Sequence, residues 1–195
     1  MEPMPDAAVR RPSPLRLALL SAALSVTATW LTRALVARLD AGRGSMSRRE
    51  HLALVLHRES DRRLSPLAVW VMRRTRGSLA SLYHVEALVL TTTGRRTGQR
   101  RSVVLQSFAD GDAFVVVGTN DGGDRPPAWY LNLAADPAVE VEVRGRRFAA
   151  RAVELPAEEA AAWWRRIVEF APDYERYARA TDRAFPVVRL EPVRA

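Results

Sequence analysis

The sequence predicts a mainly β domain of the α+β class, a small antiparallel barrel preceded by helices. Its 195 residues suffice for one domain with a well-packed core. Beyond residue 85 the chain consists of short apolar runs separated by turn residues, which is typical of strands. Because most of these runs follow one another at hairpin distance, they favour an antiparallel barrel over a parallel sheet.

Before the predicted barrel the composition changes twice. Residues 1–45 form a leader in which an uncharged stretch, 17–32, is flanked by Arg16 and Arg33. This stretch is shorter than the roughly 20 residues of a membrane-spanning helix, so we expect a short membrane-associated helix or one that packs on a partner. Met46 directly follows the flexible break AGRGS, and a chain that starts there lacks the leader.

Residues 46–84 are expected to be helical and basic. Leu52, Val55 and Leu56 recur at a helical period and share one face. A Ser-Pro pair at 65–66 is typical of a helix start, because proline is favoured in the first turn, and it predicts a second helix from there.

Residues 85–195 form the predicted barrel domain. Three consecutive valines at 115–117 indicate a central strand covered on both faces, whereas the alternating VEVEV at 139–143 has one buried and one wet face. Asp-Gly-Asp at 110–112 and Gly145 stand where hairpin turns are needed. The expected strands are 87–92, 102–108, 113–119, 138–144, 147–154 and 187–191.

Helices are expected to interrupt these strands. A short helix at 128–134 ends before an Asp-Pro stop, and a longer one at 156–170 has a proline in its first turn. Another short helix carries Tyr174 and Tyr177. The apolar face of the longer helix is predicted to comprise Ala160, Trp163, Trp164, Ile167 and Phe170.

Composition argues against several kinds of site. Without cysteine there is no disulfide and no thiolate catalysis, and the three histidines lack the spacing of a zinc motif, so we expect no metal. The net charge of +8 comes entirely from arginine, because the sequence has no lysine. Such an excess is either a solvated surface or a contact for an anionic ligand. Since no nucleic-acid motif accompanies it, we expect no nucleic-acid partner.

The segment TTTGRRTGQRR, residues 91–101, is the strongest candidate for a binding loop. Gly94 and Gly98 allow tight turns and close approach of backbone N–H groups, and the arginines offer bidentate contacts to phosphate or carboxylate. A hairpin loop whose arginines face water explains the same residues equally well. No Lys-Ser or Lys-Thr pair follows the glycines, so the segment is not the loop of a nucleoside-triphosphate hydrolase.

Two further segments carry candidate chemistry. In GTNDGGDRPPAWY, residues 118–130, the small residues at a strand end can let a flat ring lie against backbone amides. Trp129 is equally well explained as a wall for that ring or as an anchor of its helix in the core. Tyr174 and Tyr177 share a helical face, and a tyrosine hydroxyl beside a redox ring can donate a proton. On the residues alone, packing is the simpler explanation of this pair.

Five segments in fixed order together resemble the deazaflavin-dependent nitroreductase family, whose members are also described as quinone reductases that use reduced coenzyme F-420. The segments are TTTGRRTGQRR, GTNDGG, PAWYLNLAADPAVEVEV, the two-tyrosine helix and TDRAFPVVRLEP. The resemblance covers about residues 88–192, and residues 65–82 are similar to the helix that precedes the barrel in this family.

This resemblance implies a split β-barrel like that of FMN-binding proteins. It implies a hydride transfer from the deazaflavin to a small hydrophobic acceptor, namely a quinone, nitroaromatic or enone. The tail phosphate and polyglutamate would lie on Arg95, Arg96 and Arg101, and Tyr174, with Tyr177 as its neighbour, would be catalytic. The residues assigned to the cofactor are Arg95, Arg96, Thr97, Arg101, Thr119, Asn120, Gly122, Gly123 and Trp129.

Three positions depart from the family pattern. Ala171 stands where a further tyrosine can occur, Asn120 where a lysine can, and Arg100 where proline is usual. The first leaves the substrate open, and the third removes Arg100 from the assigned set. FMN is the alternative cofactor, since its phosphate can use the same arginines, and a non-catalytic cofactor- or lipid-binding protein is the alternative function.

The expected location is the cytoplasm, with attachment to the inner face of the plasma membrane as an open alternative. The stretch 17–32 and its flanking arginines motivate that alternative. The oligomeric state is not predicted.

Overall fold

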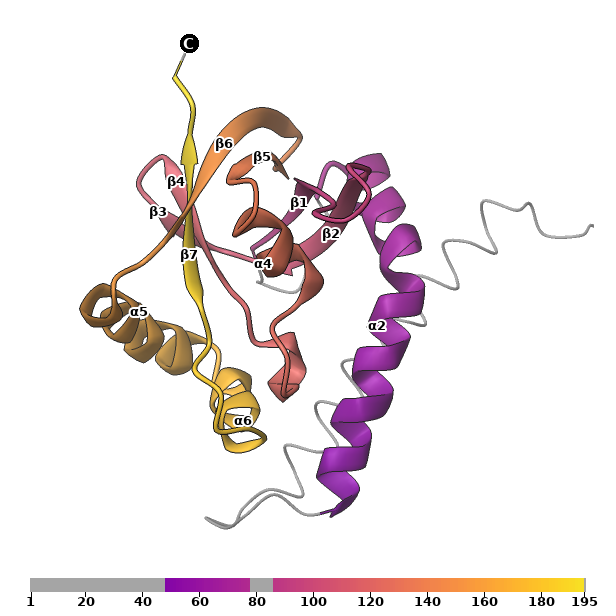
Figure 1. The fold of residues 1–195 in the computed structure, drawn as a ribbon, viewed down its shortest axis with the longest axis vertical. Helices are drawn as coiled ribbons and strands as arrows, with labels where there is room; N and C mark the ends of the chain where they lie inside the picture. The colour runs from indigo at the N-terminus through magenta and orange to yellow at the C-terminus, as the bar shows by residue number, and fades with distance from the viewer. Residues whose placement is uncertain (1–47, 78–85, 195) are drawn as a thin grey trace, which may run out of the picture. The chain divides into compact units, whose positions relative to one another are not determined.

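The computed structural model describes residues 48–77 and 86–194, which form a curved sheet and four α-helices (Figure 1). Among these helices none is both long and apolar enough to cross a membrane. The leader stretch 17–32 lies outside the described residues.

A seven-stranded antiparallel sheet forms the framework, in the order β2-β1-β5-β6-β7-β4-β3. The two edge strands, β2 and β3, are consecutive in the chain and only Ser107 separates them. The sheet therefore has to curl until its edges approach, which makes it a split barrel. The strands are β1 (Ala87–Thr93), β2 (Arg100–Gln106), β3 (Phe108–Asp110), β4 (Ala113–Val117), β5 (Ala138–Val143), β6 (Arg146–Glu154) and β7 (Val187–Pro192).

The single strand predicted at 102–108 is wrong at Ser107, where the chain breaks into two strands. Ser107 donates its N–H to the carbonyl oxygen of Glu86 at 2.8 Å, which extends the β1–β2 register by one residue, and from Phe108 onward the chain pairs with β4 instead. The predicted hairpin turns are confirmed: Gly111 has φ +60, and Arg144 and Gly145 have φ +49 and +74 between β5 and β6. Two successive positive φ angles are the geometry of a tight two-residue hairpin.

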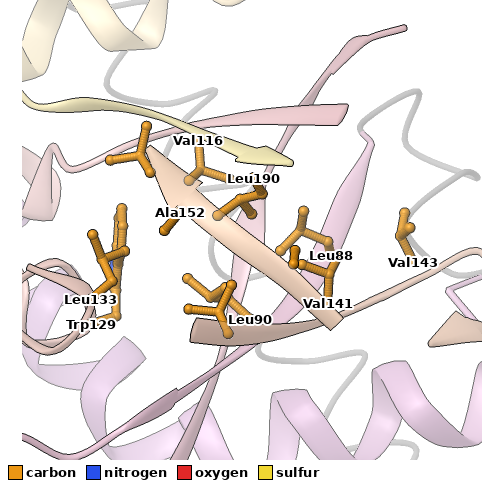
Figure 2. Packing of buried hydrophobic residues seen from close by; sticks show 12 residues of the cluster. Leu88, Leu90, Val116, Trp129, Leu133, Val141, Val143, Ala152 and Leu190 are labelled. Carbon is orange, nitrogen blue, oxygen red and sulfur yellow. The ribbon is translucent and has the colours of Figure 1, made fainter. Parts of the chain in front are cut away.

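Two apolar clusters lie on opposite sides of the sheet. The inner cluster is built from alternate residues of five strands, including Val116 and Val141, and Trp129 and Leu133 pack at one end of it (Figure 2). The outer cluster contains Val115 and Val117. All three valines of 115–117 are buried, which confirms a central strand covered on both faces.

Three helices follow the strands as expected from the sequence: α4 (Ala128–Leu133), α5 (Ala157–Phe170) and α6 (Asp173–Arg179). The last two cover the outer cluster, where Ile167 of α5 is 1% exposed. Phe170 was predicted to share that buried face, but 69% of it is exposed. As the last residue of α5 it lies beside edge strand β3, where its ring meets Phe108 edge-on at 6.3 Å between centroids.

The helix before the barrel, α2 (Arg48–Thr75), is continuous, so the second helix start predicted at 65–66 is wrong. Pro66 lies inside this helix. The helix tolerates it, because a proline lacks one N–H and so removes a single helical hydrogen bond. The predicted apolar face is also not the buried one. Leu52 and Leu56 are 57% and 59% exposed, whereas Leu54 is 7% exposed and packs in the outer cluster.

Candidate functional site

The loop that joins β1 to β2, residues 94–99, is a tight structure held by its own backbone. Gly94 donates its N–H to Gln99 O at 2.8 Å, and its carbonyl accepts from Thr97 and Gly98 at 3.1 and 2.7 Å. Gly98 has φ +65, and a Cβ on Gly94 would lie 3.0 Å from Gln99 O. Both glycines are therefore required by the fold of the loop.

Asn132 of α4 fixes this loop to the barrel. Its Oδ1 accepts the N–H of Arg95 at 3.2 Å, and its Nδ2 donates to Thr92 Oγ1 at 3.1 Å. Asn132 and Thr92 are 6% and 0% exposed, so the hydrogen bond between their side chains is shielded from water, and the one from Arg95 is partly buried. The backbone that carries the arginines is thus held from the buried side of the sheet.

The register of β1 and β2 sorts the arginines by face. Arg101 is directly opposite Thr92, so its side chain leaves the sheet on the face where α4 packs. Arg100 is opposite Thr93, on the other face, and lies 3.5 Å from the carboxylate of Glu140. This placement supports leaving Arg100 out of the site.

The other three candidate arginines, two on the loop and one at the start of β2, are exposed, and no carboxylate among the described residues neutralises their charge. Among the described residues, neither Arg95, Arg96 nor Arg101 forms an ion pair, and Arg101 donates only to the neutral Oε1 of Gln99, at 3.1 Å. Thr97 is exposed beside them, with its hydroxyl 3.4 Å from Gln99 N. Guanidinium groups without carboxylate partners are available to phosphate or carboxylate ligands.

A second loop, between β4 and α4, contains the other predicted cofactor residues in an unusual conformation. Asn120, Asp121 and Gly122 have φ of +48, +49 and +70, so three successive residues are left-handed. Thr119 precedes them in the right-handed region and is 8% exposed. A right-handed residue followed by a left-handed one directs successive N–H groups to one side, an arrangement suited to electronegative atoms.

This second loop leads directly into α4, the helix that braces the first loop through Asn132. The structure therefore brings the two predicted groups of cofactor residues to opposite ends of one short helix. Trp129 of that helix is 8% exposed and belongs to the inner cluster (Figure 2). This burial supports the packing explanation of Trp129, and its contact with a cofactor stays a prediction.

The two tyrosines lie in the outer cluster, on α6. Tyr174 and Tyr177 are 7% and 6% exposed, with ring centroids 5.8 Å apart, and Tyr174 also meets Phe108 edge-on at 6.0 Å. Their helix supports the second loop, because a Cβ on Gly122 would lie 2.9 Å from Tyr177 O. Tyr177 thus packs behind the loop predicted to hold the ring, and Tyr174 lies next to Tyr177 in the outer cluster.

Sequence reasoning missed two residues of this region. Asn132 is the one amide in the apolar helix sequence AWYLNL, a signal that could have identified it. Arg183 donates hydrogen bonds to three carbonyls of the second loop. Its partners are backbone atoms some sixty positions earlier in the chain, for which a sequence pattern offers no signal.

Residues 65–192 match the family model described as F420H(2)-dependent quinone reductase. An F420H(2)-dependent quinone reductase of Mycobacterium tuberculosis strain H37Rv is 39% identical over 107 residues, which cover 53% of this chain and 72% of that protein.

Two solved structures share the fold. An F420-H2 dependent reductase, FDR-A, is 34% identical with a TM-score of 0.50, covering 54% of this chain and 93% of that one. A structure described as a domain-swapped dimer has the same identity and TM-score, covering 54% of this chain and 79% of that one.

Proposed function

This chain belongs to the F420H(2)-dependent quinone reductase family, and from that premise we propose that it transfers a hydride from reduced coenzyme F-420 to a quinone. It is an oxidoreductase whose cofactor is the deazaflavin. FMN and a non-catalytic role are not favoured, because the matching family and the relative from M. tuberculosis are both named for the F420H(2)-dependent reaction.

One observation supports the placement of the cofactor tail. Arg95, Arg96 and Arg101 are exposed cations without ion pairs among the described residues; the first two lie on a loop that Asn132 holds in place, and Arg101 follows it at the start of β2. The anionic tail of the deazaflavin requires such donors, and guanidinium forks match phosphate and carboxylate in geometry. The donor set therefore fits the cofactor, with Thr97 as an additional hydroxyl donor.

The second loop is proposed to receive the ring. The N–H groups of Thr119 and Asn120 are suited to ring oxygens, while Gly122 and Gly123 let the backbone turn closely beside α6. When bound, the deazaflavin supplies the hydride. The chain's contribution is to orient the ring and the acceptor and to exclude water between them.

Tyr174 is the proposed hydrogen-bond or proton donor to the acceptor oxygen, with Tyr177 as its neighbour. A family pattern motivates this role, and it is supported by the position of Tyr177 behind the second loop with Tyr174 beside it. Nitroaromatic and enone acceptors are further proposals. Because Ala171 stands where the family can have a tyrosine, this chain has one potential hydroxyl donor fewer than such relatives. Tyr174→Phe is expected to lower kcat for a quinone while leaving the affinity for the deazaflavin unchanged.

A pair of adjacent arginines provides the sharpest test of the tail site. Arg101→Gln and Arg100→Gln make the same change of charge in neighbouring residues on opposite faces of β2. We expect Arg101→Gln to weaken deazaflavin binding about tenfold, the loss expected for one charge-assisted hydrogen bond, and Arg100→Gln to have little effect. Equal effects of the two variants in a fluorescence titration would mean that only general charge attracts the cofactor.

We also propose that the protein acts in the cytoplasm, with the leader stretch 17–32 holding it against the inner face of the plasma membrane. The uncharged stretch and the arginines that flank it support this location. The full chain should sediment with membranes, and a chain that begins at Met46 should not. Recovery of the full chain entirely in the supernatant would contradict the proposal.

A further inference from the structure

Arg183 lies between α6 and β7 and reaches back to the loop that follows β4. Its Nε donates to Gly123 O at 3.1 Å, and its Nη2 donates to Gly118 O at 3.2 Å and Thr119 O at 2.8 Å. Its Nη1 donates to Ala184 O at 3.2 Å, on its own segment. One guanidinium thus links both ends of the loop to the segment between α6 and β7.

The three loop carbonyls bracket the left-handed turn at 120–122. Asn120 and Asp121 are not glycines, so their positive φ angles store conformational strain that surrounding contacts have to offset. Hydrogen bonds within the loop include those from Gly122 N to Thr119 O, from Gly123 N to Asn120 O and from Asn120 Nδ2 to Arg125 O, at 3.1, 2.9 and 3.0 Å. These bonds are internal to the loop, whereas Arg183 ties it to the barrel.

The position of Arg183 is itself well fixed. Gly118 donates its N–H to Pro186 O at 2.9 Å, which attaches the Arg183 segment to the end of β4. The guanidinium also stacks 4.8 Å from the centroid of Phe185. Burial lowers the pKa of Arg183, an effect that the Asp124 carboxylate opposes, but an arginine remains protonated at neutral pH.

We propose that Arg183 is a positioning residue, which holds the loop at 118–123 in the shape that receives the deazaflavin ring. This inference rests on the proposed function of that loop. A planar fork with five donors can serve carbonyls at both ends of the turn at once, which a lysine ammonium cannot do with the same geometry. The residue acts through the loop backbone and needs no contact with the cofactor.

Arg183→Met removes the donors but keeps much of the aliphatic stem, and Arg183→Lys keeps the charge. We expect Arg183→Met to raise the Kd and KM for the deazaflavin about tenfold, equivalent to losing one hydrogen bond to a charged group. Arg183→Lys should recover part of that affinity. Without cofactor, backbone amides at 118–125 should exchange hydrogen faster in Arg183→Met than in the wild type.

Arg189→Met is the matched control. Arg189 is a partly buried arginine that pairs with Asp110 and Glu159, and within the described part of the chain it forms no hydrogen bond or ion pair with the second loop. It should lower the Tm while leaving the exchange at 118–125 and the Kd at wild-type values. Arg183→Met that binds like the wild type, or Arg189→Met that weakens binding equally, would overturn the role of Arg183. Failure of the wild-type chain to bind the deazaflavin would instead overturn the proposed function.

Discussion

Asn132 illustrates how a single buried side chain can support a binding loop without touching the ligand. Its amide satisfies the hydroxyl of Thr92 inside the barrel and the N–H of Arg95 at the start of the loop. Buried polar groups that lose their partner are costly, so the loop backbone cannot easily leave this position. The backbone position from which the side chains of Arg95 and Arg96 extend is thereby fixed.

Asn132→Ala should remove both hydrogen bonds at once. We expect a loss of about 1–3 kcal/mol in the free energy of unfolding, because the Thr92 hydroxyl stays buried without this partner. Deazaflavin affinity should fall as well, since Arg95 is no longer anchored. Urea unfolding and a cofactor titration measure the two effects.

Tyr130→Phe is the control for that substitution. It lies on the same helix and loses one hydrogen bond, to Glu154 at 2.8 Å, without touching the β1–β2 loop. It should leave the cofactor affinity unchanged. If Asn132→Ala also binds the deazaflavin with unchanged affinity, the loop does not depend on its anchor.

Gly122 is a position where both backbone conformation and space require glycine. An added Cβ would lie 2.6 Å from Ala180 Cβ and 2.9 Å from Tyr177 O, at φ +70. Gly122→Ala should lower the free energy of unfolding by about 1–3 kcal/mol more than Gly111→Ala, the usual cost of overpacking. Gly111 has φ +60 and nothing within 4 Å, so it isolates the effect of φ. Similar losses of stability for Gly122→Ala and Gly111→Ala in thermal unfolding would show that α6 shifts to make room for the added Cβ.

Residue types identified the arginine loop from the sequence, because glycines and guanidinium groups have recognisable uses. They did not identify Arg183 or assign the faces of Arg100 and Arg101. Those facts depend on strand register and on carbonyl groups from distant segments, and every residue carries a carbonyl. The sequence therefore predicted the residues whose side chains are suited to bind a ligand. It did not predict Arg183, whose side chain binds backbone carbonyls of another segment.

Among the elements, β5 shows how one strand serves two environments. Its valines are buried in the inner cluster, while Glu140 and Glu142 face outward to arginines. Glu142 accepts from Arg73 of α2 at 2.5 Å, and Arg73 also reaches Ser102 of β2 at 3.3 Å. This ion pair and the hydrogen bond to Ser102 attach the end of α2 to the sheet.

The acid dependence of stability should report on this outer face. The hydrogen bond from Arg147 is the main cause that holds the pKa of Glu140 below its ordinary value, against the smaller opposing effect of burial. A lowered carboxyl pKa stabilises the fold above the ordinary pKa, and that contribution disappears as the pH falls through the folded pKa. Glu140→Gln should therefore lower the Tm by a few degrees at most at neutral pH, and converge with the wild type in acid. A difference that persists unchanged at low pH would contradict this origin.

Element by element, periodicity predicted the strands and helices of the barrel to within a few residues. It failed at Ser107 and at Pro66, for opposite reasons. A continuous apolar pattern crosses Ser107, but the chain changes its pairing partner there, from β1 before Ser107 to β4 after it. A proline suggests a boundary at residue 66, but α2 absorbs the missing N–H and continues.

At the scale of the whole molecule, the two loops proposed to bind the cofactor come from different strand connections and meet at α4. One follows β1, and the other follows β4, on strands that are not neighbours in the sheet. The sequence predicted both loops and their order along the chain. That they lie at the two ends of α4 depends on the curl of the sheet and on Asn132. The barrel therefore supplies the spacing between tail site and ring site.

The most direct test of the central claim is turnover with the purified full chain, reduced F-420 and a water-soluble naphthoquinone. We expect the absorbance of the oxidised deazaflavin to appear with saturation in both reactants. The double variant Arg96→Gln/Arg101→Gln should show a raised KM for the cofactor, and Arg100→Gln should behave like the wild type. Oxidation no faster than in the absence of protein would contradict the account.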